Sequence, residues 1–120
     1  MDTILIIDDD PEIVEFTKKR LERSGYRVLG ALDGTEGVAI AIKEKPDLIL
    51  LDIMMPLKDG YTVLRELKEN GATRDTPVIM LTAKSGSGSV LECQECGATD
   101  YFIKPFDWEE LLRYIKKYIP

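Results

Sequence analysis

The stretch LILLDIMMP, residues 48–56, decides the fold. Its first four residues are aliphatic, and an apolar run this short and this rich in leucine and isoleucine is typical of a strand buried on both faces. Asp52 ends the run, before two methionines and a proline. Because a carboxylate is costly in a hydrophobic core, we interpret Asp52 as a functional residue that the strand presents at its end.

Similar apolar runs recur along the chain between helical patterns. They are residues 4–7, 48–51, 78–81 and 101–103, with a weaker run at 26–32. Five strands that alternate with helices predict a parallel sheet covered by helices on both faces, which is the α/β class. A chain of 120 residues can build one core, so we expect residues 1–120 to form a single domain.

Acidic residues mark the starts of the expected helices. Asp10 stands before a proline, which is the order of an N-cap and a first helical residue. Asp33 and Asp107 are each followed three residues later by a glutamate, the spacing of a capping box. Residues 59–60, an Asp-Gly pair, are interpreted as a turn that begins a helix ending near residue 70.

Two further expectations concern helices. The helix that begins after Asp10 carries an apolar stripe that the stem of Arg20 extends: Ile13, Phe16 and Leu21. Residues 90–96 predict a fourth helix of five. The preceding SGSGS stretch, residues 85–89, combines high backbone entropy with poor helix propensity, so we predict a mobile loop there.

Charge and hydropathy exclude two classes of partner. Acidic residues outnumber basic ones by 22 to 16, so the chain lacks the basic footprint of a nucleic-acid-binding surface. No apolar run approaches the length of a membrane span, and the N-terminus lacks the basic leader of a signal peptide. We therefore expect a cytoplasmic protein with no direct contact to nucleic acid or membrane.

The histidine and cysteine content restricts the chemistry. The chain has no histidine, which excludes Ser-His and Cys-His nucleophiles, imidazole metal sites and a phosphohistidine on this chain. Cys93 and Cys96 form a C-x-x-C without a second pair, so we interpret them as packing residues on successive turns of a helix. Any chemistry must then use carboxylates, hydroxyls and lysine.

Polar side chains follow most of the predicted strands, and in a parallel sheet such residues meet at one edge. They are Asp8, Asp9 and Asp10 after the first strand, Asp52 after the third, Thr82 after the fourth and Lys104 after the fifth. Crowded carboxylates repel one another unless a cation lies among them, and Mg²⁺ suits a shallow site with few carboxylates. We expect Asp9 and Asp52 to be ligands, Asp8 to bind directly or through water, and Asp10 to cap a helix.

Mg²⁺ beside a carboxylate, a hydroxyl and a lysine is an arrangement that transfers phosphoryl groups. The metal neutralises phosphoryl oxygens, while the lysine and the hydroxyl hold the others. Since a carboxylate can itself be the nucleophile, we interpret Asp52 as the group that takes the phosphate.

Four stretches together resemble the response-regulator receiver domain of two-component signalling. They are IIDDD at 6–10, LLDIMMPLKDG at 50–60, IMLTA at 79–83 and GATDYFIKPF at 97–106, and they cover essentially the whole chain in the family's order and spacing. The resemblance implies a flavodoxin-like, doubly wound sheet with strand order 2-1-3-4-5. It also implies Mg²⁺-dependent transfer to Asp52 from the phosphohistidine of a sensor histidine kinase or a histidine phosphotransfer protein.

The resemblance also assigns roles by position. It makes Asp8 and Asp9 the acidic pair, Met54 a backbone-carbonyl ligand of the metal, Thr82 the switch hydroxyl, Lys104 the lysine that pairs with Asp52, and Tyr101 the aromatic switch residue. It implies that phosphorylation changes the face of the fourth helix, fifth strand and fifth helix. A downstream output domain or protein is expected to bind that face.

Three other readings need comparison. A phosphatase of the haloacid-dehalogenase type also uses an Asp nucleophile, and Asp8 and Asp10 have its D-x-D spacing, but no D-x-D-G-T follows and Asp52 is left unexplained. A phosphate-independent interaction module would need none of the matched site residues. A flavin carrier of the same topology would need uncharged or basic donors after the first strand, where this chain is acidic.

Overall fold

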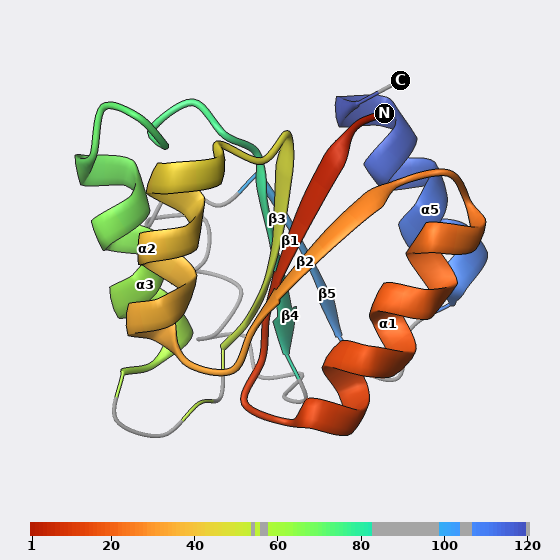
Figure 1. The fold of residues 1–120 in the computed structure, drawn as a ribbon, viewed down its shortest axis with the longest axis horizontal. Helices are drawn as coiled ribbons and strands as arrows, with labels where there is room; N and C mark the ends of the chain where they lie inside the picture. The colour runs from red at the N-terminus through yellow and green to blue at the C-terminus, as the bar shows by residue number, and fades with distance from the viewer. Residues whose placement is uncertain (54, 56–57, 83–98, 104–106, 120) are drawn as a thin grey trace.

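Five parallel strands form one sheet through the centre of the molecule (Figure 1). The computed structural model describes residues 1–53, 55, 58–82, 99–103 and 107–119. The strands are β1 (Thr3–Ile7), β2 (Arg27–Ala31), β3 (Leu48–Asp52), β4 (Val78–Thr82) and β5 (Asp100–Ile103). All neighbouring strands pair in parallel, in the order β2-β1-β3-β4-β5. This order confirms the predicted flavodoxin-like topology.

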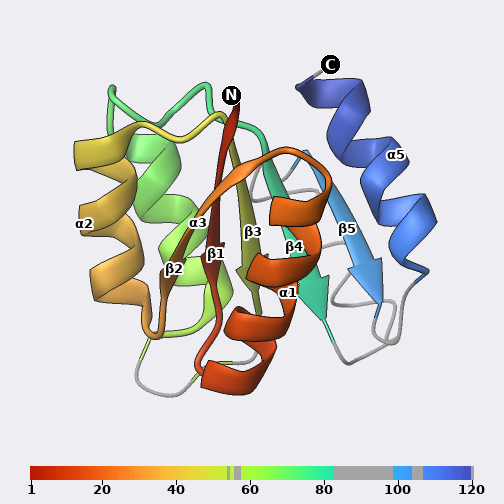
Figure 2. The ribbon, with the colours of Figure 1, turned by 45° about the vertical axis from the view of Figure 1, so that its right-hand side comes forward.

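Helices cover both faces of the sheet. The described helices are α1 (Pro11–Arg23), α2 (Gly34–Glu44), α3 (Gly60–Glu69) and α5 (Trp108–Tyr118). In Figure 1 and Figure 2, α1 and α5 lie on one face and α2 and α3 on the other. The label α4 is kept for the helix predicted within residues 90–96. That helix, the SGSGS stretch and the C-x-x-C pair lie outside the described residues.

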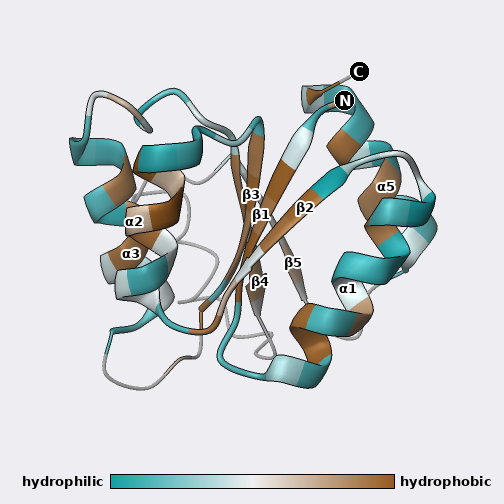
Figure 3. Cartoon of the chain, viewed as in Figure 1, coloured by the Kyte–Doolittle hydropathy of each residue, from teal (hydrophilic) through white to brown (hydrophobic). Residues whose placement is uncertain are grey.

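The buried strands send alternate side chains into two cores. Residues 4–7 of β1 and 48–51 of β3 are at most 1% exposed, as the continuous apolar runs predict. Leu5 and Ile49 join the core under α2 and α3, whereas Ile4 and Leu48 join the core under α1 and α5. Figure 3 shows largely hydrophobic strands at the centre, between helices in which hydrophilic and hydrophobic residues alternate. Among the described residues, no helix is both long and apolar enough to cross a bilayer.

An aspartate caps the N-terminus of every described helix. Each Asp side chain accepts a hydrogen bond from a backbone N–H of the first turn: Asp10 from Glu12 at 2.9 Å, Asp33 from Glu36 at 2.7 Å, Asp59 from Thr62 at 2.9 Å and Asp107 from Glu109 at 2.8 Å. A cap of this kind contributes about 1 kcal/mol to helix stability. The helix starts predicted at these positions are confirmed.

The apolar stripe predicted for α1 does not form one buried face. Leu21 is buried, but Ile13 and Phe16 are 36% and 57% exposed. Val14, Thr17 and Leu21 face the sheet instead. Val14 can pack this close to the sheet because Gly30 of β2 has no side chain. A Cβ on Gly30 would stand only 2.7 Å from Cγ1 of Val14.

The other apolar edge of α1 turns toward α5. The ring centroids of Phe16 and Trp108 are 5.8 Å apart, and the Arg20 guanidinium lies 5.5 Å from the centroid of the Trp108 ring. Tilted aromatic pairs and cation–π contacts of this kind are favourable at partly exposed sites. Phe16 of the predicted stripe and the Arg20 side chain that extends it therefore pack at the junction of α1 and α5.

Candidate functional site

Three carboxylates meet at the carboxyl ends of two neighbouring strands. The register pairs Ile7 of β1 with Leu51 of β3, so the next residues, Asp8 and Asp52, leave adjacent strands side by side. One carboxylate oxygen from each of Asp8, Asp9 and Asp52 lies within 4.8 Å of the others. Asp8 and Asp52 are only 2% and 7% exposed, whereas Asp9 is exposed. The predicted convergence of acids at this edge is therefore present.

The loop after β1 orients the first of these acids. The Asp8 N–H donates to the carbonyl of Ala31 at 3.1 Å, which extends the pairing of β1 with β2 by one residue. Its side-chain Oδ1 accepts from the Asp10 N–H at 3.0 Å. The Asp10 carboxylate is engaged in capping α1, as predicted. The phosphatase reading required this carboxylate in a D-x-D pair, so the structure gives that reading no support.

The remaining predicted site residues are placed by backbone alone or lie outside the described residues. Thr82 ends β4 and pairs with Ile103 of β5, so its backbone lies at the same edge of the sheet as Asp52. Tyr101 lies in β5, where it pairs with Met80 of β4. Met54 and Lys104 fall outside the described ranges. The structure therefore brings together three predicted ligands and the strand end that carries the predicted hydroxyl.

The donor set suits a hard cation. Three carboxylates within 4.8 Å of one another concentrate negative charge in a partly buried position. Oxygen ligands of this type, few in number and open to water on the side of Asp9, are those that Mg²⁺ takes in proteins. The residues present thus fit a divalent cation, and the same set without a cation would be destabilised by mutual repulsion.

Perturbed ionisations occur at the other end of the molecule. Burial raises the pKa of Tyr26, and the nearby Asp2 adds to the effect. Burial lowers the pKa of Lys68, which Asp75 partly offsets, and its ammonium donates to the carbonyls of Arg74 and Thr76 at 3.1 and 3.0 Å. Tyr26 precedes β2 and Lys68 lies near the end of α3, so neither belongs to the acidic site.

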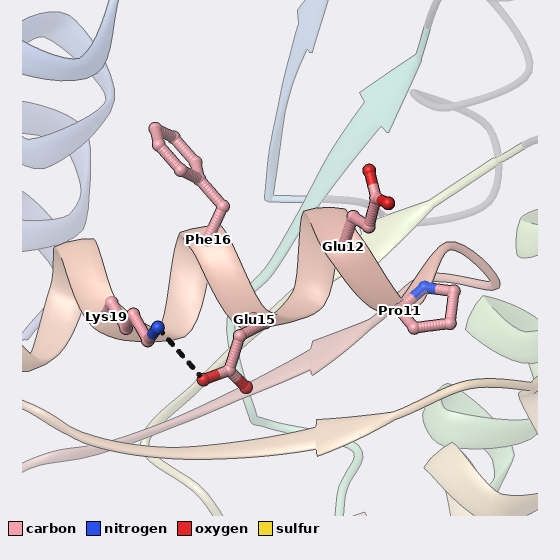
Figure 4. A pocket seen from close by; sticks show the side chains of 5 residues that line it. All are labelled: Pro11, Glu12, Glu15, Phe16 and Lys19. Atoms are coloured by element: carbon pink, nitrogen blue, oxygen red, sulfur yellow. Dashed lines mark ion pairs between the residues drawn. The ribbon is translucent and has the colours of Figure 1, made fainter.

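An open depression on α1 is separate from the acidic cluster. It has a volume of about 390 Å³ and is lined by Pro11, Glu12, Glu15, Phe16 and Lys19. Figure 4 shows these side chains along one helix, with Glu15 and Lys19 joined by an ion pair of 3.7 Å. None of the predicted site residues lines it, so we do not assign the chemistry to this depression.

Residues 58–60 make contacts that the sequence pattern did not reveal. The Asp59-Gly60 pair begins a helix, as predicted, but Gly60 also lies so close to β3 that a Cβ on it would stand 2.6 Å from the carbonyl oxygen of Asp52. Lys58 forms an ion pair with Glu66 of α3. The sequence did contain one indication of this contact. Gly60 is the first residue of a helix, and glycine has a poor helix propensity, so its presence there suggests a steric requirement.

The comparisons with known proteins agree with this geometry. The family described as the response regulator receiver domain matches residues 4–116. The transcriptional regulator RpaA of Synechocystis is 46% identical over 97% of this chain, and the match covers 48% of RpaA. The chain thus spans about half the length of that regulator.

Solved structures give the same result. Chemotaxis protein CheY4 of Vibrio cholerae superposes with a TM-score of 0.92 at 32% identity, covering 98% of both chains. The receiver domain of sensor histidine kinase PA1611 from Pseudomonas aeruginosa has a TM-score of 0.90 at 35% identity, covering 98% of this chain and 97% of that one. That neighbour holds a magnesium ion coordinated in its active site cleft. The sequence, the fold and the clustered acids together show that this chain belongs to the response regulator receiver domain family of two-component signalling.

Proposed function

We propose that Asp52 accepts a phosphoryl group and that the chain catalyses this transfer itself. The observation that carries the proposal is the position of Asp52 at the end of a buried strand, with a carboxylate oxygen within 4.8 Å of those of Asp8 and Asp9. Asp52 ends β3 at the carboxyl edge of the sheet and is 7% exposed.

Asp8, Asp9 and Asp52 would hold Mg²⁺, and the backbone carbonyl of Met54 is predicted to complete the protein ligands. When bound, the ion neutralises charge on the phosphoryl oxygens. The chain supplies the rest: Asp8 is fixed by the Asp10 N–H and by the pairing of its own N–H with Ala31. A fixed ligand lowers the entropic cost of binding because its orientation is set before the cation arrives.

In the transfer, a carboxylate oxygen of Asp52 forms a bond to phosphorus as the bond between phosphorus and the donor's imidazole nitrogen breaks. The electron pair of the broken bond stays on that nitrogen, and the imidazole takes up one proton from the solvent. The donor must bring the histidine, because this chain has none. A sensor histidine kinase or a histidine phosphotransfer protein fits this requirement.

The roles proposed for the other predicted residues rest on the family resemblance and on their positions at the ends of β4 and β5. Thr82 and Lys104 are proposed to hold phosphoryl oxygens, with Lys104 paired to Asp52 beforehand. Tyr101 is proposed to respond to the movement of Thr82. The strand β5 is an edge strand beside α5, so a change there would reach an output domain or protein through the predicted α4, β5 and α5 face.

We place this activity in a single domain, residues 1–120, that acts in the cytoplasm. The chain is about half the length of RpaA. An output module elsewhere in a longer protein and a separate output partner both fit that arrangement.

Intact-protein mass spectrometry tests the proposal. After incubation with acetyl phosphate, the wild type should gain one phosphoryl group with Mg²⁺ and none with EDTA. Asp52→Asn should fold and gain none. Asp10→Asn is the matched control, since asparagine also caps helices and Asp10 should not contribute to the site. Persistent labelling of Asp52→Asn would refute the assignment, and an unlabelled but folded wild type would favour the phosphate-independent module.

A further inference from the structure

The first residue of α3 lies against the backbone of Asp52. A Cβ placed on Gly60 would stand 2.6 Å from both the carbonyl oxygen of Asp52 and the Cα of Ile53, where real Cβ contacts are essentially never under 3.0 Å. The Gly60 N–H donates to the Ile53 carbonyl at 2.9 Å. The chain that leaves Asp52 therefore returns to it eight residues later, and only glycine permits the approach.

Lys58 fixes this return at a second point. Its Cδ and Cγ lie 3.0 and 3.3 Å from the position of a Cβ on Gly34, the first residue of α2. Its ammonium lies 2.8 Å from one carboxylate oxygen of Glu66 and 3.1 Å from the other. The side chains of Lys58 and Glu66 are 27% and 39% exposed, so this pair is less solvated than an ordinary surface ion pair. Lys58 thus joins the start of α2 to the second turn of α3.

We propose that Gly60 and Lys58 are positioning residues that hold Asp52 in the orientation required for phosphoryl transfer, an inference that rests on the function proposed above. Catalysis of this transfer depends almost entirely on positioning and electrostatic stabilisation. Gly60 sets the backbone beside Asp52 through its close approach and its hydrogen bond to the Ile53 carbonyl, and Lys58 holds the segment that carries Gly60. Movement of the start of α3 would therefore move the carboxylate that attacks phosphorus.

If Gly60 served only to begin α3, Gly60→Ala would have a different effect. Helix propensity favours alanine over glycine, so Gly60→Ala would stabilise α3 if the contact with Asp52 were unimportant. Gly71→Ala is the matched control: Gly71 has no heavy atom within 4 Å of its Cβ position and lies in the turn after α3. Both substitutions remove the same backbone freedom from the unfolded chain, and only the first meets the backbone of Asp52.

Lys58→Met separates the two contacts of that side chain. Methionine keeps an unbranched stem over Gly34 but removes the ion pair with Glu66. Lys19→Met is its control, because it removes the same charge from an exposed ion pair, with Glu15 at 3.7 Å and side chains 68% and 59% exposed. Glu66→Gln, made in the wild type and in Lys58→Met, completes a double-mutant cycle. If the ion pair acts as a unit, the effects of the two substitutions should not add.

The experiment measures two quantities for each variant. The backbone amide resonances of Asp52 and Ile53 report the local geometry in the absence of phosphate, and the phosphorylation rate at saturating acetyl phosphate and Mg²⁺ reports the chemistry. We expect Gly60→Ala to shift both resonances and to slow the rate by about tenfold to 100-fold. Lys58→Met should slow the rate less, while Gly71→Ala and Lys19→Met should leave rate and resonances unchanged.

The outcomes distinguish this inference from the proposed function. If the wild type is not phosphorylated, the proposed function fails, whatever the resonances show. If the wild type is phosphorylated and a folded Gly60→Ala keeps its resonances and its rate, the positioning role is overturned. If Gly60→Ala does not fold, Lys58→Met decides: a wild-type rate and unmoved Asp52 and Ile53 resonances overturn the proposal, and a slower rate with shifted resonances supports it.

Discussion

We expect Asp8→Asn to stabilise the folded protein in the absence of Mg²⁺ and to leave it less stable than the wild type in the presence of Mg²⁺. Asp8→Asn keeps a side-chain oxygen that can accept from the Asp10 N–H, as Asp8 Oδ1 does at 3.0 Å. It removes one of three charges whose oxygens lie within 4.8 Å of one another. At an effective dielectric constant of about 20, two unit charges at this separation repel by about 3.5 kcal/mol.

Solvent and neighbouring charge reduce that figure. Asp9 is exposed, so water and salt screen its interaction with the other two acids. Lys104 is predicted to bring a positive charge to the same edge of the sheet. We therefore expect Asp8→Asn to raise the free energy of unfolding in EDTA by about 1 to 2 kcal/mol.

With Mg²⁺ present, the wild type should be more stable than Asp8→Asn. A ligand present at 100 times its dissociation constant stabilises the folded state by about 2.7 kcal/mol, and the variant has lost one ligand of the proposed site. Urea unfolding followed by the fluorescence of Trp108, the single tryptophan, measures both conditions. Glu69→Gln, at the exposed far end of α3, controls for net charge. Loss of stability in EDTA, or an equal gain from Mg²⁺ in variant and wild type, would refute the reasoning.

Two further predictions concern groups away from the site. Because burial raises the pKa of Tyr26, the folded protein keeps a phenolic proton that the unfolded chain releases near its ordinary value of 10.0. Stability should therefore fall as the pH rises above about 10, and Tyr26→Phe should reduce that slope in urea titrations; an identical slope would contradict the assignment. The fully buried Thr73 donates from Oγ1 to the Leu67 carbonyl at 2.6 Å. Thr73→Val should cost about 1 to 3 kcal/mol of unfolding free energy by urea denaturation, and a neutral result would show that the bond contributes nothing net.

The central strands β1 and β3 were predictable because their environment is uniform along their length. A parallel strand with helices on both faces buries every residue, so its sequence is a continuous apolar run, as in residues 48–51. The convergence of Asp8 and Asp52 followed from the same topology, because the carboxyl ends of parallel strands share one edge. For these features, knowing the class of sheet was enough.

The orientation of α1 was not predictable in the same way. The helix has two apolar edges, one with Ile13 and Phe16 and one with Val14 and Leu21, and hydropathy alone favours neither. The choice depends on Gly30 in another element, where the absent side chain lets Val14 approach, and on Thr17, a polar residue that is 4% exposed. The contact between Gly60 and Asp52 was missed for the same reason, since it exists only in the folded chain.

The same sheet edge explains why ligands and helix caps are hard to tell apart in this sequence. In a parallel α/β fold, each helix begins where a strand ends, so the four capping aspartates lie at the end of the sheet that carries Asp8, Asp9 and Asp52. Their chemistry is identical, but their partners differ. A capping acid accepts from a backbone N–H two or three residues later, so the helix start decides its role. Pro11 begins α1 and thereby assigns Asp10 to the helix, which leaves the two preceding acids to face Asp52. The positive ends of the same helices also lie toward this edge, and they offset part of the repulsion that the clustered carboxylates create.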